Sequence, residues 1–169
     1  NWGDLDYLII DLPPGTGDAP LTLAQTIPIT GIIIVTTPQD VAMNVAVKAV
    51  GMFNKLNVPI IGVIENMSYL ECQHCNNKIN IFGTGGGKKI SDQFNVPFIG
   101  EIPLHQQIMS ASDSGNPVTI AEPNDNQAVI FDKISRTVAG RISIIASELQ
   151  EQEKTTNEQS KEHQSVNTA

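Results

Sequence analysis

The stretch "LIIDLPPGTGD", residues 8–18, places a carboxylate directly after an apolar run and follows it with two prolines and two glycines. An uninterrupted run of Leu and Ile is typical of a strand that is buried on both faces of a parallel sheet. Asp11 then stands at the carboxyl end of that strand, the edge of an open α/β sheet where ligands bind. The residues alone leave two interpretations open, a contact with a cation or its water shell and a turn-initiating aspartate.

Apolar, β-branched runs recur along the chain and indicate further strands of the same sheet. Besides residues 7–10, they occupy residues 31–35, 59–64 and 97–102. Helical patterns at residues 18–27 and 39–56 separate the first three runs, and a further apolar stripe spans residues 126–149. Strands that alternate with helices form βαβ units. The sequence therefore predicts an α/β fold with a doubly wound, mainly parallel sheet flanked by helices.

The two ends of the chain differ from its middle. The chain starts at Asn1 and reaches the first apolar run after a few residues, so we expect that an N-terminal part of the domain is missing. Residues 151–169 contain one large aliphatic side chain, Val166, among many Gln, Glu, Thr and Asn residues. Such a segment buries too little apolar surface to offset the entropy lost on ordering. We therefore predict a domain over residues 1–150 and a disordered polar tail over residues 151–169.

Charge and composition argue against two classes of partner. The net charge is −8 and the largest basic cluster is the pair Lys88 and Lys89, whereas nucleic-acid binding requires clustered Lys and Arg. No apolar run approaches the roughly 20 residues that span a bilayer, and residues 1–20 lack the pattern of a signal peptide. We therefore expect a cytoplasmic protein that binds neither nucleic acid nor a membrane.

Cys72 and Cys75 are the only cysteines and form a C-x-x-C pair around Gln73 and His74. A cytosolic compartment disfavours a structural disulfide, which leaves a metal site, a redox dithiol or a chance spacing. Two thiolates supply half of a tetrahedral metal site, and a symmetry-related copy of the chain is the simplest source of the other half. The residues after Cys75 lack the helical pattern of a thioredoxin-type motif. The spacing favours a shared metal site and leaves the other two interpretations open.

Two further segments resemble nucleotide-binding elements only in part. The run "GTGGGKK", residues 83–89, fits neither G-x-x-x-x-G-K-[ST] nor G-x-G-x-x-G, so we expect a flexible approach to a helix that starts near Lys88. Asn66 follows the strand run "IIGVIE" and is placed to hydrogen-bond a base at the sheet edge, although Asn is also common in turns. Of the two segments, Asn66 stays a candidate for nucleotide contact.

A series of motifs resembles the Mrp/ApbC family of iron–sulfur cluster carrier ATPases, relatives of MinD and of the nitrogenase iron protein in the deviant-Walker P-loop class. The motifs lie within residues 2–118 and read "WGDLDYLIIDLPPGTGD", "TTPQDVA", "GVIENMS", the C-x-x-C pair, "IFGTGGG", "VPFIGEIPL" and "SDSGNPV". The series is far more specific than any single motif. The resemblance implies a P-loop NTPase fold that binds ATP and Mg²⁺. It also implies a homodimer that carries a [4Fe–4S] cluster, with cluster scaffolds and apo iron–sulfur proteins as partners.

The resemblance further implies roles for individual residues at the nucleotide. Asp11 is similar to the Walker B aspartate. The loop after it is similar to the switch that senses the γ-phosphate, and consists of Pro14, Gly15, Thr16 and Gly17. Two later residues are similar to contacts on the adenine side, Asn66 and Pro103. The family's lysine-containing Walker A loop would precede Asn1, so the resemblance implies that residues 1–169 do not hydrolyse ATP alone.

For the metal, the resemblance implies that Cys72 and Cys75 are ligands of a [4Fe–4S] cluster that bridges two protomers. Three residues depart from the family pattern. Gln73 stands where Pro is common, and His105 and Met109 stand where Asp and Arg are common.

Two other functions would use some of the same features. A MinD-like partitioning ATPase needs a basic amphipathic membrane helix near its C-terminus, and residues 151–169 are acidic and polar. A non-catalytic dimer linked by zinc would use the same Cys72 and Cys75 thiolates. We therefore expect a carrier ATPase, and the metal content after anaerobic reconstitution separates it from the zinc-linked dimer.

Overall fold

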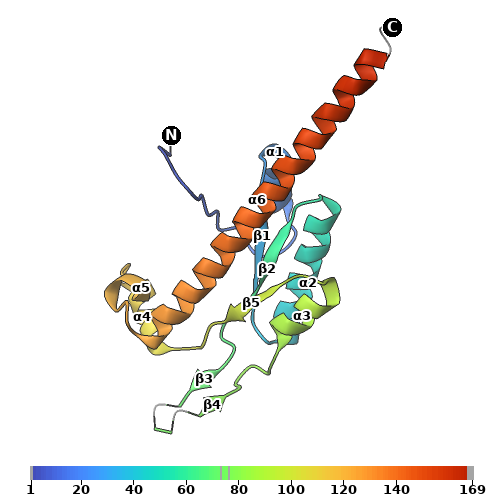
Figure 1. The fold of residues 1–169 in the computed structure, drawn as a ribbon. Helices are drawn as coiled ribbons and strands as arrows, with labels where there is room; N and C mark the ends of the chain where they lie inside the picture. The colour runs from blue at the N-terminus through green and yellow to red at the C-terminus, as the bar shows by residue number, and fades with distance from the viewer. Residues whose placement is uncertain (1, 73, 76, 167–169) are drawn as a thin grey trace.

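The computed structural model describes residues 2–72, 74, 75 and 77–166, and Figure 1 shows how they are arranged. In chain order the elements are α1 (Asp18–Thr26), β1 (Ile32–Thr36), α2 (Asp40–Lys55), β2 (Ile60–Glu65), β3 (Leu70–Glu71), β4 (Lys78–Ile79), α3 (Gly86–Phe94), β5 (Phe98–Glu101), α4 (Gln106–Asp113), α5 (Val118–Ala121) and α6 (Asn126–Val166).

Three parallel strands form the main sheet, in the order β1-β2-β5. β2 lies in the centre and is buried along its whole length, which agrees with its apolar run. Its last residue, Glu65, pairs with Thr36 at the end of β1 and with Glu101 at the end of β5. The carboxyl ends of the three strands therefore meet at one edge of the sheet. These strands confirm the predictions at residues 31–35, 59–64 and 97–102.

Each face of the sheet has its own hydrophobic core. On one face, α2 and α3 pack against β1 and β2 around Val50, Val63 and Ile90. On the other face, α6 packs against the sheet around Ile64 and Ile134. Val63 and Ile64 are neighbours in β2, and successive side chains of a strand point to opposite faces. Helices thus cover both faces, as Figure 1 shows, and the predicted doubly wound α/β fold is confirmed.

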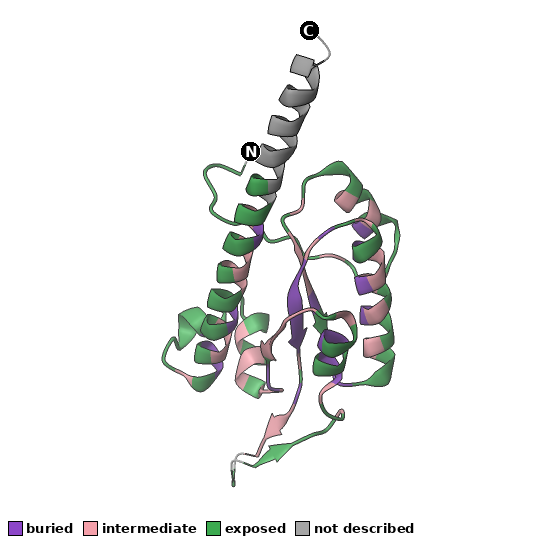
Figure 2. Ribbon diagram, turned by 45° about the vertical axis from the view of Figure 1, so that its right-hand side comes forward, coloured by how far each residue is buried: buried purple, intermediate pink, exposed green. Residues whose placement is uncertain are grey.

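Residues 7–10 do not form the strand that their composition predicts. Among the described residues no strand precedes α1, and the run is exposed, with Ile9 at 84%. Figure 2 shows this N-terminal segment in the colour of exposed residues. A strand is stable only when a neighbouring strand pairs with its backbone, and no described strand pairs with this run. An apolar composition therefore predicts where a strand can form but does not supply its partner.

Helix α6 continues to Val166, whereas the sequence predicts a helix over residues 126–149 and disorder beyond residue 150. Residues 151–166 contain no Pro or Gly and many Glu, Gln and Lys residues, which have favourable helix propensities. A low apolar content does not exclude a helix, because a helix satisfies its backbone hydrogen bonds internally. The domain boundary near residue 150 stays a prediction. Although α6 is long, no helix in the described residues has the apolar stretch that a bilayer crossing requires.

Candidate functional site

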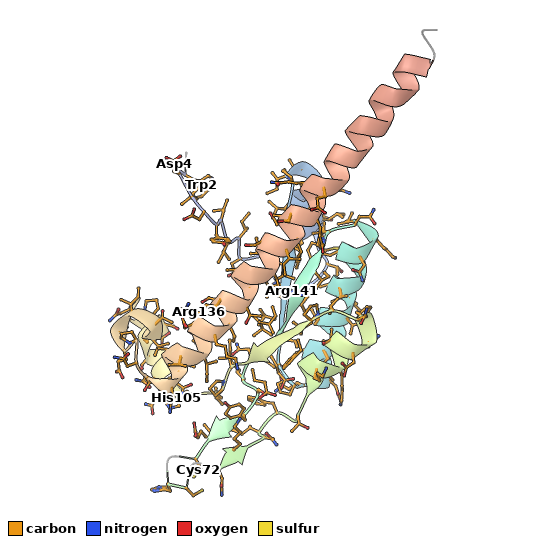
Figure 3. All side chains as sticks on the ribbon, viewed as in Figure 1. Trp2, Asp4, Cys72, His105, Arg136 and Arg141 are labelled. Atoms are coloured by element: carbon orange, nitrogen blue, oxygen red, sulfur yellow. The ribbon has the colours of Figure 1, made fainter. Side chains whose placement is uncertain are left out.

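The Cys pair lies at the tip of a small hairpin that leaves the carboxyl edge of the sheet. Its legs, β3 and β4, pair antiparallel over two residues each. Directly after β3, the Cys72 N–H donates to the Asn77 carbonyl at 3.0 Å and closes the turn. Figure 3 shows Cys72 at the end of the hairpin, away from the main sheet.

Backbone hydrogen bonds tie the base of this hairpin to the chain that follows β5. The Ser68 N–H donates to the Ile102 carbonyl at 3.0 Å, and the Leu104 N–H donates to the Tyr69 carbonyl at 2.8 Å. The Lys78 ammonium lies 3.8 Å from the centroid of the Tyr69 ring, a cation–π contact that joins the two legs. The sheet therefore holds the base of the hairpin, and the turn with the cysteines projects from it.

Both thiols are free; Cys72 is half-buried and Cys75 is exposed. The backbone N–H groups of His74 and Cys75, and then the Cys75 side chain, hydrogen-bond the Cys72 sulfur and lower the pKa of Cys72. A lower pKa favours the thiolate, which is the form that binds metals. Within the described residues, no group of three or more His, Cys, Asp and Glu side chains is arranged to hold a metal. The two thiolates therefore fit half of a metal site. Gln73, which stands between the cysteines and departs from the family pattern, lies outside the described residues.

Asn66 and Pro103 follow neighbouring strands and lie at the same edge of the sheet. The Asn66 N–H donates to the Thr36 carbonyl at 2.7 Å. The Asn66 Oδ1 accepts the Met67 N–H at 2.9 Å, as expected of a turn residue. Pro103 is buried after β5. The structure thus brings these two candidates close in the fold to the base of the Cys hairpin.

The loop that carries Asp11 lies before α1. Leu12 packs against the core formed by α2 and α3, whereas Asp11 is exposed. Gly15 has a φ of 97°, a conformation that favours glycine. No hydrogen bond between described residues joins this loop to Asn66 or Pro103. The remaining loop candidates are also exposed: Pro14, Thr16 and Gly17.

The glycine run at residues 83–87 is explained by backbone conformation and close packing. Gly85 caps the N-terminus of α3 with a φ of 66°. A Cβ at Gly86 would lie 2.6 Å from the Met43 sulfur, and a Cβ at Gly87 would lie 3.0 Å from the Glu65 Cβ. The predicted flexible approach to the helix is therefore wrong. Gly86 and Gly87 are closely packed, and α3 begins at Gly86, two residues before Lys88, in contact with α2 and β2.

Glu65 is the polar residue of this region that the sequence analysis missed. It ends the buried run "IIGVIE" and is 0% exposed. Carboxylates are almost never fully buried without partners, so a Glu at the end of such a run is the signal that could have identified it.

Two departures from the family pattern lie at α4. His105 precedes this helix, and its Nδ1 accepts the Gln107 N–H at 3.3 Å as a cap. Met109 is exposed on the helix. His105 therefore has a structural contact of its own, and nothing in the structure explains Met109.

A family model described as ParA, NUBPL iron-transfer P-loop NTPase, matches residues 1–139. The iron-sulfur cluster transfer protein NUBPL of Dictyostelium discoideum is 48% identical over 145 residues, which are 86% of this chain and 45% of that protein. The iron-sulfur cluster carrier protein of Deinococcus radiodurans is 49% identical over 152 residues, 89% of this chain and 43% of that protein. The chain thus spans slightly less than half the length of these relatives.

Solved structures agree with this match. A nucleotide-binding protein from Archaeoglobus fulgidus, in complex with ADP and with cobalt, has a TM-score of 0.64 at 40% identity, over 75% of this chain and 51% of that chain. The MinC:MinD cell division complex from Aquifex aeolicus has a TM-score of 0.52 at 18% identity, over 67% of this chain and 44% of that chain. This likeness concerns only the fold. Since the family match covers most of its length, this chain belongs to the NUBPL iron-transfer P-loop NTPase family.

Proposed function

We propose that this chain is part of an ATP-dependent iron–sulfur cluster carrier, and that Cys72 and Cys75 of two copies hold its cargo, a [4Fe–4S] cluster. The observation that carries the proposal is the β3–β4 hairpin, which presents two free thiols, one with a lowered pKa, on a base held by the sheet. The curated relatives are named as carrier and transfer proteins for iron–sulfur clusters, which supports it. Cluster scaffolds would load the protein, and apo iron–sulfur proteins would receive the cluster.

The homodimer in this proposal follows from the number of ligands. A [4Fe–4S] cube has four iron corners, and one hairpin offers two thiolates. In a two-fold dimer the same surface of each protomer meets its copy, so two hairpins supply the set without a further residue. The exposed thiol of Cys75 and the projecting hairpin in Figure 3 suit such an approach.

The nucleotide part of the proposal rests on the loop before α1 and on the carboxyl edge of the sheet. Asp11 would hold Mg²⁺ through water, and residues 14–17 would respond to the γ-phosphate. Asn66 uses Oδ1 within its own turn, which leaves Nδ2 to donate toward the base, while Pro103 adds an apolar contact. A nucleotide-binding relative supports ATP as a ligand. Hydrolysis is proposed for the full-length protein, because residues 1–169 contain no Walker A loop.

Anaerobic reconstitution of the full-length protein with iron and sulfide tests the cargo. We expect a brown protein with about four iron atoms per dimer, which elutes as a dimer. Cys72→Ala and Cys75→Ala should each lose most of the iron and shift the elution toward monomer. His74→Ala is the matched control, because it lies between the cysteines and keeps the backbone N–H that faces the Cys72 sulfur.

Zinc accepts the same four thiolates, so the identity of the metal decides between the carrier and the zinc-linked dimer. A colourless protein that keeps about one zinc per dimer and refuses iron contradicts the carrier function. If both Cys variants bind iron as the parent does, the ligands lie elsewhere in the protein.

A further inference from the structure

Glu65 is a fully buried carboxylate at the carboxyl end of β2, and both of its oxygens have short contacts. Oε1 accepts the Ser68 hydroxyl at 2.6 Å, and Oε2 accepts the Gly87 N–H at 2.6 Å. Within the described residues no Lys, Arg or His forms an ion pair with it. Its two oxygens are instead satisfied by these two donors, one of which belongs to the N-terminus of α3.

The two donors lie at opposite ends of the segment that carries the Cys pair. Ser68 stands just before β3, and Gly87 is the second residue of α3, which follows β4 and the glycine run. Backbone hydrogen bonds add to the link between Glu65 and Ser68. The Glu65 carbonyl accepts the Ile102 N–H at 2.8 Å, and the Ile102 carbonyl in turn accepts the Ser68 N–H at 3.0 Å. The Glu65 side chain therefore joins both ends of residues 68–87, the segment that contains the hairpin, to the central strand β2.

The start of α3 packs so closely against Glu65 that no further atom fits between them. A Cβ at Gly87 would lie 3.0 Å from the Glu65 Cβ and 3.0 Å from Cε2 of Phe98. The helix therefore begins directly on the Glu65 side chain. A side chain that removes the carboxylate contacts would release the start of α3 and, with it, the returning end of the hairpin segment.

We propose that Glu65 is a positioning residue for metal binding at Cys72 and Cys75. It touches neither cysteine; it acts by holding both ends of residues 68–87, so that the hairpins of two copies can present their thiolates in one geometry. This inference rests on the proposed function, since it concerns the same Cys pair, but Glu65 belongs to none of the ligand or nucleotide residues named above.

Titration of the full-length, metal-free protein with Co²⁺ alone, followed by cobalt–thiolate absorbance under anaerobic conditions, tests the proposal. Glu65→Met keeps the length of the side chain and removes both acceptors, so we expect Co²⁺ affinity to fall by about tenfold or more, the scale seen when groups that orient metal ligands are lost. Glu65→Gln should restore most of the affinity. Its Oε1 can accept the Gly87 N–H while its amide donates to the Ser68 hydroxyl.

The matched control is Arg141→Met, which weakens the same strand at a distance from the hairpin. Arg141 Nε donates to the Ile61 carbonyl at 2.6 Å. If Glu65 acts only through the stability of β2, the two Met variants should lower Co²⁺ affinity equally. We expect Arg141→Met to leave the affinity unchanged at temperatures well below unfolding, and an equal loss would overturn the proposal.

Amide hydrogen exchange gives a second measurement that needs no metal. Ser68→Ala removes one of the two carboxylate contacts with a smaller change than Glu65→Met, and serves if that variant does not fold. Either variant should speed exchange of the Cys72 and Leu104 amides by about tenfold or more, the factor that loss of a buried hydrogen bond implies. Amides of α2 should not change. If the Cys72 and Leu104 amides exchange in the variant as slowly as in the parent protein, the role of Glu65 is overturned.

The two measurements separate this inference from the proposed function. A parent that binds no Co²⁺ through Cys72 and Cys75 contradicts the metal function, and with it the role of Glu65 in metal binding. A parent that binds Co²⁺ through these cysteines, together with an unaffected Glu65→Met variant, overturns the inference and leaves the proposed function intact.

Discussion

At the residue scale, Cys72 has the most specific chemical environment in the candidate site. The N–H groups of His74 and Cys75 lower the pKa of Cys72, so in the folded protein its thiolate forms at a lower pH than in the unfolded chain. Since the thiolate is the nucleophile, we expect alkylation of Cys72 by iodoacetamide to accelerate at a lower pH in the folded, metal-free protein than in urea. Mass spectrometry at a series of pH values measures this. Coincident profiles for the folded and unfolded protein would contradict the hydrogen bonds to sulfur.

Asp11, also at the residue scale, is expected to serve nucleotide chemistry and not folding. Its side chain is exposed in the loop before α1. In the full-length protein, Asp11→Asn should leave the melting temperature nearly unchanged, while ATP turnover falls by about 10²-fold or more, the scale for removing an electrostatic contributor from a reacting centre. Asp18→Asn, in the adjacent first turn of α1, is the control and should keep its turnover. Unaltered turnover in Asp11→Asn would remove this residue from the site.

At the scale of elements, a long-range hydrogen bond joins α6 to the central strand. The register of β1 and β2 shifts between Ile32 and Ile33, and Ile61 of β2 lies at that shift. There, Arg141 Nε donates to the Ile61 carbonyl at 2.6 Å, and Figure 3 shows Arg141 where α6 crosses the sheet. Arg141→Met keeps the apolar stem and removes the donor from a buried carbonyl. We expect the free energy of unfolding, measured in urea, to fall by about 1–3 kcal/mol.

Arg136 supplies the control on the same helix. Its Nε lies 2.7 Å from an Asp132 oxygen, one turn earlier, and both side chains are exposed. Exposed pairs of this kind contribute little to stability, so Arg136→Met should hardly move the urea midpoint. If both Met variants destabilised the protein to the same degree, the contact with Ile61 would not be what joins α6 to the sheet.

At the scale of the whole molecule, α6 crosses one face of the sheet and continues beyond it, as Figure 1 shows. Ile134 and Ile145 are buried on this helix. Residues 151–169 add a single large aliphatic side chain, Val166. Deleting residues 151–169 should therefore change the free energy of unfolding by no more than about 0.5 kcal/mol, the usual range for surface changes. Thermal unfolding of the truncated protein checks this, and a large loss would show that the segment docks on the rest of the molecule.

The sequence by itself determined the features that depend on neighbouring residues. The apolar runs that form β1, β2 and β5 are a local signal, because a continuous β-branched segment is typical of a strand that is buried on both faces of a sheet. The order of the motifs determined the family, and the spacing of Cys72 and Cys75 determined that they are candidate metal ligands. Both are properties of the linear chain that folding does not alter.

Only the tertiary structure decided the features that require two distant segments. Residues 7–10 have the composition of a strand, yet no described strand pairs with them, and pairing is a property of the partner. The contacts of Glu65 with Gly87 and of Arg141 with Ile61 join residues that no local pattern connects. A buried carboxylate and a buried carbonyl each need a donor, and the folded chain supplies that donor from whichever segment the topology brings near. For this physical reason the sequence predicted the cysteines as candidate ligands, whereas only the structure supplied the contacts of Glu65 from which we propose its positioning role.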